Sequence, residues 1–143
     1  MNKDKIFELF ENGDMASANP KGTLVEKILD SPYNKIGMFT KLIINHFTFH
    51  KKLKKFFKEE GTEFNMEKVK EASQYTVFNR AWYYIEQIDV KNKDHIKAIG
   101  EFECLTFNKA LQDSISHFED REEYERCAHL FKIKEIVNTF ENS

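Results

Sequence analysis

Two histidines four residues apart are the first side chains in this sequence whose type and spacing could do chemistry. His46 and His50 lie one turn apart on an expected helix, and imidazole nitrogens at this spacing can share a metal ion. Both positions also fall near the apolar arc of that helix, which favours interior histidines held by hydrogen bonds. We expect the second arrangement, and therefore neither a metal nor a cofactor.

Three further pairings involve histidines near the C-terminus. Asp113 with His117, and Glu125 with His129, have the i, i+4 spacing that is typical of surface ion pairs on helices. Cys127 lies only two residues before His129, so the two side chains would point to different sides of a helix. A nucleophile needs a base within hydrogen-bonding reach, and this pair does not provide one.

The common signatures of nucleotide and metal chemistry are absent from the sequence. Glycine occurs only at positions 13, 22, 37, 61 and 100, so neither GxGxxG nor GxxxxGK[ST] can be formed. There is no HExxH, and no Glu precedes a His by three residues as in di-iron bundles. The sequence therefore predicts no catalytic residue and no enzyme.

Lysines gather in the stretch HKKLKKFFKEEG, residues 50–61, although the chain has a net charge of −2. Residues 33–58 carry seven lysines and no acid, whereas residues 101–143 carry ten acids and five bases. Four of the clustered lysines share one arc of a helix at 100° per residue. The cluster consists of Lys51, Lys52, Lys54, Lys55 and Lys58.

Several roles fit this lysine cluster. It can be a solvated face balanced by the acidic C-terminal part, a contact for nucleic-acid phosphates, or a contact for an acidic protein or an anionic lipid. Lysines act as point charges, and with only three arginines any nucleic-acid binding would be independent of sequence. The overall acidic balance counts against a dedicated nucleic-acid binder. We expect a protein partner or self-association, with a nucleic-acid-associated factor as the alternative.

The opposite arc of the same helix is apolar and is expected to face the core. Ile44 and Phe47 lie on the lysine side, so the first half of this helix is apolar nearly all round. Such a half should be covered by other helices or by a partner. The expected core positions are Phe39, Leu42, His46, Phe49, Leu53, Phe56 and Phe57.

A second candidate contact lies in QYTVFNRAWYYIEQI, residues 74–88, where three aromatic residues are adjacent. Helical angles place Phe78, Trp82 and Ile85 on one side, separate from Ala81, Tyr84 and Ile88. Two apolar faces are typical of a helix central to a bundle, or one face is a docking surface around Arg80 and Trp82.

The elements that position these side chains are all expected to be helices. Thr23 with Glu26 forms a capping box, and Ser31 followed by Pro32 starts a helix over 32–60. Further helices are expected for about 23 residues after Asn65, over 94–118, and after a capping box of Asp120 with Glu123. Alternating strand patterns are nowhere sustained. We predict an all-α compact bundle of about four main helices, with residues 1–22 an N-terminal arm and residues 23–143 one domain.

Composition places the chain among intracellular globular proteins. It has 143 residues, 41% of them hydrophobic, and only two cysteines, Cys104 and Cys127, which we expect to remain free thiols. The N-terminus does not resemble a signal peptide and no apolar run is long enough for a membrane span. We therefore expect a cytoplasmic protein. The excess of lysine over arginine suggests AT-rich coding, as in low-GC bacteria and their phages.

Residues 111–137, LQDSISHFEDREEYERCAHLFKIKEIV, resemble the UVR motif. The match is Tyr124-Glu125-x-Cys127-Ala128-x-Leu130, preceded by a helix with Leu111 and Ile115. Phe131-Lys132 and Lys134 stand where the motif has Arg-Asp and isoleucine. That motif is a helical hairpin of nucleotide-excision-repair subunits and some protease adaptors. The resemblance implies a hairpin over about 111–140 that pairs with another hairpin, on the same protein or on a partner.

Overall fold

The computed structural model describes residues 24–60 and 66–142, which form six helices and no strand. The predicted all-α fold is therefore confirmed. The helices are α2 (Leu24–Leu29), α3 (Pro32–Glu60), α4 (Met66–Ile85), α5 (Lys93–Glu101), α6 (Cys104–Asp120) and α7 (Tyr124–Glu141).

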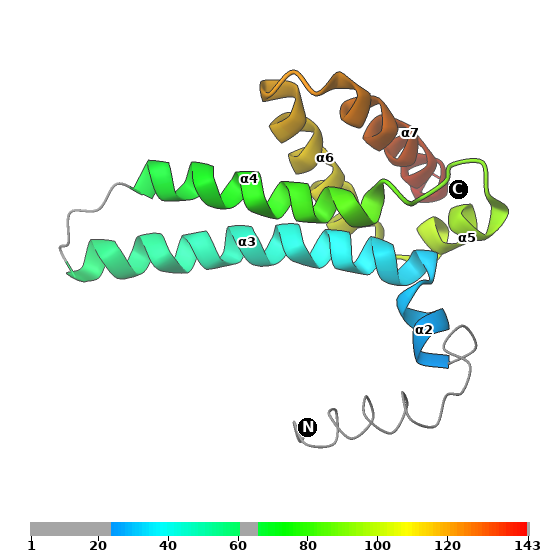
Figure 1. Cartoon of the computed structure of the whole chain (residues 1–143), viewed down its shortest axis with the longest axis horizontal. Coiled ribbons are helices and arrows are strands. Elements are labelled where there is room, and N and C mark those ends of the chain that lie inside the picture. Colours follow the sequence, from blue (N-terminus) through cyan, green and yellow to red (C-terminus); the bar gives the residue numbers. More distant parts are fainter. Residues whose placement is uncertain (1–23, 61–65, 143) are drawn as a thin grey trace.

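Two helical hairpins form the molecule. The long helices α3 and α4 lie side by side, α6 and α7 form the second hairpin, and α6 passes behind α4 (Figure 1). The short helix α5 lies between the two hairpins in the sequence and contacts both α3 and α7. The core is where the hairpins meet, and its largest fully buried side chains are Phe39, Phe78, Phe107, Phe118, Ile36, Ile43, Ile85, Ile88, Ile99, Leu111, Ile115 and Leu130.

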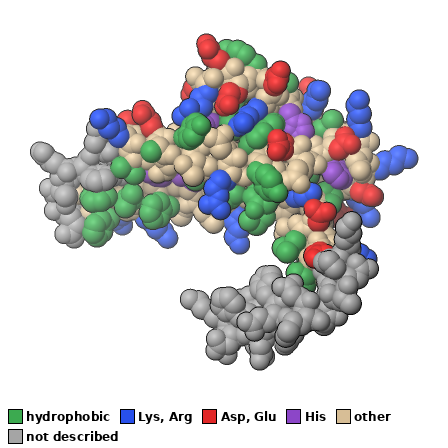
Figure 2. All heavy atoms as spheres, viewed as in Figure 1, with side chains coloured by type: hydrophobic (Ala, Val, Ile, Leu, Met, Phe, Trp, Pro, Cys, Tyr) green, Lys and Arg blue, Asp and Glu red, His purple; other side chains and the backbone are tan. Residues whose placement is uncertain are grey.

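The α3–α4 hairpin extends well beyond the other helices (Figure 1). Among the described helices, only α4 lies along this part of α3, so a narrow arc of α3 is buried there. Phe49 and Phe56, which the helical pattern predicts to be in the core, are 60% and 54% exposed, whereas Leu53 and Phe57 on the side toward α4 are half-buried. The core prediction is wrong for these two phenylalanines, because a single neighbouring helix covers less than the whole apolar arc. Hydrophobic side chains are visible near this end of the hairpin in Figure 2.

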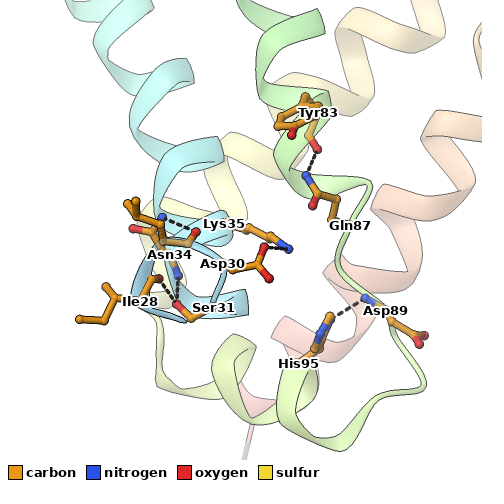
Figure 3. Close-up of polar contacts among 10 residues, drawn as sticks. Ile28, Asp30, Ser31, Asn34, Lys35, Tyr83, Gln87, Asp89 and His95 are labelled. Carbon is orange, nitrogen blue, oxygen red and sulfur yellow. Dashed lines mark hydrogen bonds and ion pairs between the residues drawn. The ribbon is translucent and has the colours of Figure 1, made fainter. Parts of the chain in front are cut away.

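The start of α3 follows the sequence-based prediction. Ser31 Oγ accepts a hydrogen bond from the backbone N–H of Asn34 at 3.2 Å and donates to the carbonyl of Ile28 at 2.7 Å. Lys35 forms an ion pair with Asp30 at 3.3 Å, which links α3 to the end of α2 (Figure 3). The Ser31 cap is thus confirmed. The predicted Thr23 cap and the N-terminal arm lie outside the described residues.

The helix expected over residues 94–118 is in fact two helices. Phe102 has an extended backbone, with φ −82° and ψ 152°, and separates α5 from α6. Its ring packs against Tyr33 and Phe107, with centroids 5.3 and 5.7 Å apart. The Glu103 carboxylate accepts hydrogen bonds from two N–H groups in the first turn of α6, at 3.0 and 2.8 Å. The ring contacts and the cap offset the lost helical hydrogen bonds, and helical periodicity cannot detect either of them.

The predicted capping box of Asp120 with Glu123 is also wrong. Asp120 is the last residue of α6, and Glu123 precedes α7 without a capping hydrogen bond from its side chain. The turn instead ends α6 as a Schellman motif. Glu123 N–H donates to Phe118 at 2.9 Å, Glu122 N–H donates to Glu119 at 3.0 Å, and Glu122 has a left-handed φ of 60°.

Candidate functional site

The five clustered lysines are all exposed on the distal half of α3. None of them forms an ion pair within the described part of the chain. Residues 33–58 themselves contain no acid. Exposure of these lysines agrees with their solvated arc on the helix, since a buried unpaired ammonium is costly. The lysines are Lys51, Lys52, Lys54, Lys55 and Lys58.

The two exposed phenylalanines lie on the same distal half of α3, on the arc opposite Lys51, Lys54, Lys55 and Lys58. Phe49, Lys52 and Phe56 are spaced i, i+3 and i+7, so they follow one side of the helix. The Phe56 ring meets the ring of its neighbour Phe57 edge to face, with centroids 5.5 Å apart. We call the exposed surface of this distal half of α3, which carries four of the five lysines on one arc and Phe49 and Phe56 beside Lys52 on the other, the basic–aromatic face.

The acidic turn between α6 and α7 packs against α4. Arg121 lies 4.7 Å from the centre of the Tyr75 ring, and Arg126 Nη1 donates a hydrogen bond to Asn79 Oδ1 at 2.8 Å. No ion pair among the described residues joins an acid of α6 or α7 to a lysine of α3. Within the described residues, the α6–α7 hairpin therefore does not neutralise the basic–aromatic face by ion pairs.

The histidines His46 and His50 are buried on α3, as predicted, and a third histidine lies close to them. His117 of α6 stacks on Phe78 of α4, and His46 meets the same Phe78 ring from α3. The Nε2 atoms of all three histidines are buried without a hydrogen-bond partner in the described structure. The expectation of hydrogen-bonded interior histidines is thus wrong for these nitrogens. Sequence spacing also missed His117, because only the packing of α4 against α6 brings it here.

Burial dominates the electrostatics of this histidine cluster. Burial lowers the pKa of His46, and the positive charges of His50 and Lys70 lower it further. Burial also lowers the pKa of His117 to about 4, and the nearby Arg121 adds to this effect. The neutral imidazole is therefore favoured at His46 and at His117. In residues 24–60 and 66–142 no three His, Cys, Asp or Glu side chains come together as ligands for a metal ion.

The other candidate pairs for chemistry are not brought together. Asp113 pairs with Lys109 at 3.3 Å while His117 stacks on Phe78, so their expected ion pair does not form. Cys127 donates its thiol hydrogen to the Ile115 carbonyl at 3.6 Å. Both cysteines are free thiols, as predicted.

His129 contacts residues of α4 rather than Glu125, its expected partner on α7. Its Nε2 lies 2.9 Å from the Ile85 carbonyl, and its ring contacts Trp82 at 5.5 Å between centroids. The Trp82 ring also contacts Phe118 at 5.9 Å, with the Arg126 guanidinium 5.1 Å from its centre. Trp82 is therefore half-buried where α4 meets α6 and α7, whereas Arg80 is exposed on α4.

The chain was compared with family models, characterised proteins and solved structures, and none of them matches it. The resemblance of residues 111–137 to the UVR hairpin stays a prediction. No helix in the described part of the chain is long and apolar enough to cross a membrane.

Proposed function

We propose that this protein is a non-enzymatic interaction or accessory protein that binds another protein through its basic–aromatic face. One observation carries the proposal: Phe49 and Phe56 are more than half exposed on a helical segment whose five lysines have no ionic partner among the described residues. Exposed aromatic side chains are favoured at the centres of interfaces, and charged residues are favoured at their rims. An acidic partner surface would satisfy both features.

The state of the reactive side chains supports a binding role over catalysis. Burial, with Glu119 and Glu123 nearby, raises the pKa of the Cys127 thiol, which disfavours the nucleophilic thiolate. The hydrogen-bond contact of His129 is with a backbone carbonyl and not with a nucleophile. A cytoplasmic location is part of the proposal, and two free cysteines are compatible with a reducing compartment.

Sequence-independent binding of nucleic acid is the second candidate for the same surface. The observation that favours it is the position of the exposed Phe49 and Phe56 beside Lys52, because aromatic rings can stack on bases while lysines contact phosphates. The net charge of −2 favours the protein partner.

Site-specific photocrosslinking in the native cells tests the proposed surface. A photoreactive amino acid at Phe56 should give a discrete adduct with another protein. The same group at Tyr83, which is equally exposed on α4, is the matched control and should give none. Replacing Lys51, Lys54, Lys55 and Lys58 by glutamine should remove the Phe56 adduct without unfolding the protein. Equal crosslinking from both positions, or none from Phe56, contradicts the proposal.

Fluorescence anisotropy distinguishes the second candidate. Random-sequence single- and double-stranded oligonucleotides should not bind at about 50 mM salt if the partner is a protein. Binding that falls steeply toward about 200 mM salt, and that the four-glutamine variant loses, would establish nucleic acid as the ligand.

A further inference from the structure

A groove runs between α3 and the first half of α6, on a different part of α3 from the contact with α4. It consists of two adjoining hollows of about 460 Å³ each, and both are lined by Ile44 and Thr106. The lining on α3 extends from Asn34 to Lys51, which is roughly 26 Å at 1.5 Å per residue. This length suits a helix of about four to five turns.

Apolar side chains of both helices line part of the groove and are incompletely covered. Leu105 of α6 is 75% exposed, and Ile44 and Phe47 of α3 are half-buried. The sequence indicated that this half of α3 is apolar nearly all round and needs a cover. In the described structure α6 provides only part of that cover. An apolar face of a further helix would bury Leu105 and complete it.

The unpaired charge around the groove is positive. Lys41 and Lys51 line its α3 side and form no ion pair with a described residue. The acids on the α6 side are already engaged. Glu103 caps the first turn of α6, and Asp113 is paired with Lys109 at 3.3 Å. The unbalanced charge is therefore positive, and it continues along α3 into the basic–aromatic face.

We infer that the groove binds an acidic amphipathic helix of a partner protein. Apolar residues of that helix at i, i+3 or i+4, and i+7 would contact Ile44, Phe47 and Leu105, and its acidic residues would lie over Lys41 and Lys51. This inference rests on the proposed function, that the protein binds another protein. To the proposed function it adds the class of partner, an acidic amphipathic helix, and a second binding surface, the groove. Lys51 belongs to both the groove and the basic–aromatic face.

Selection from a displayed library of random 16-residue peptides on the purified full-length protein tests the groove. The enriched peptides should be acidic and should carry apolar residues at helical spacing. In fluorescence anisotropy Leu105→Glu should weaken their binding about tenfold or more, because it removes apolar burial and repels acidic peptides. Tyr83→Glu, at a position on α4 that is 61% exposed, is the control and should leave binding unchanged. Thermal melting verifies that both variants are folded.

Several results would overturn the inference. They are an empty selection, enriched peptides that are basic or lack helical periodicity, and binding that Leu105→Glu does not affect. Peptides that lose binding with Phe56→Ser but not with Leu105→Glu would contradict the groove while supporting the proposed function. Peptides that bind only after residues 1–22 are removed would show that the chain occupies its own groove, which also contradicts a separate partner.

Discussion

The imidazole ring of His117 lies almost parallel to the phenyl ring of Phe78, with centroids 4.3 Å apart and an interplanar angle of 14°. This contact joins α6 to α4 inside the core. His46 approaches the same phenyl ring from α3, with centroids 6.4 Å apart. Three helices therefore share one aromatic side chain, and two of the three contribute a histidine whose pKa is lowered.

We predict that acid weakens the fold through these histidines. The folded-state pKa of His117 is about 4 against 6.5 for an ordinary histidine, so the folded state favours the neutral ring. The stability that this contributes is complete above pH 6.5 and is lost as the pH falls from 6.5 through 4. Protonated rings would repel each other and the nearby Arg121. The melting temperature should therefore drop across this range.

Replacement of His117 by phenylalanine, which stacks on Phe78 but does not titrate, should flatten this pH dependence. His95→Gln is the control, because His95 lies near the surface and accepts a hydrogen bond from Asp89 N–H at 2.8 Å (Figure 3). Melting curves at pH 7, 6, 5 and 4.5 provide the comparison. A slope that is the same in His117→Phe as in the native chain would assign the acid sensitivity to other groups.

Glu122→Gly should stabilise the protein. Glu122 occupies the left-handed position of the turn between α6 and α7, with φ 60°, where glycine avoids the strain of a side chain. We expect the free energy of unfolding to rise by about 0.5–1 kcal/mol in urea denaturation. Lys132→Gly, on an exposed helical position of α7, should instead lower it by a similar amount. A loss of stability in both variants would show that the turn does not require glycine-like freedom.

Gly37→Ala is a second stabilising change. Gly37 lies within α3, and a Cβ atom there would be 3.6 Å from the Phe102 ring, an ordinary van der Waals contact. The alanine should add about 0.5–1 kcal/mol, since it favours the helix. Gly100→Ala should give no such gain, because its Cβ would be 2.7 Å from the Phe140 ring. Thermal melting of the two variants decides this, and equal gains would mean that the Phe140 ring moves freely.

Arg126 should be a stabilising link between the two hairpins. Its guanidinium donates to Asn79 at 2.8 Å and lies 5.1 Å from the centres of the Trp82 and Phe118 rings. Arg126→Lys keeps the charge but loses the planar contacts, so we expect a loss of about 1–2 kcal/mol in urea denaturation. The exposed Arg80 provides the matched control, and Arg80→Lys should change stability by less than about 0.5 kcal/mol. Similar losses in both would contradict a special role for Arg126.

Local chemistry in the sequence determined the helical class and several element boundaries. Ser31 and Pro32 define where α3 begins, because a serine cap and a proline at the first position favour that start in any context. Lysines 51–58 were predictably exposed, because an ammonium group without a buried partner stays in water. These features depend on residues within a few positions of each other.

Tertiary packing alone decided which apolar residues are buried and which side chains meet. Phe49 and Phe56 have the helical spacing of core residues, yet α6 and α7 do not extend far enough along α3 to cover them. Phe102 ends α5 because Tyr33 and Phe107 surround its ring, and His117 meets Phe78 because α6 crosses α4. Helical periodicity reports only which side of a helix is apolar. The relative position of two helices depends on how distant side chains fit together, and this is why the histidine cluster, the groove and the basic–aromatic face are evident only in the folded chain.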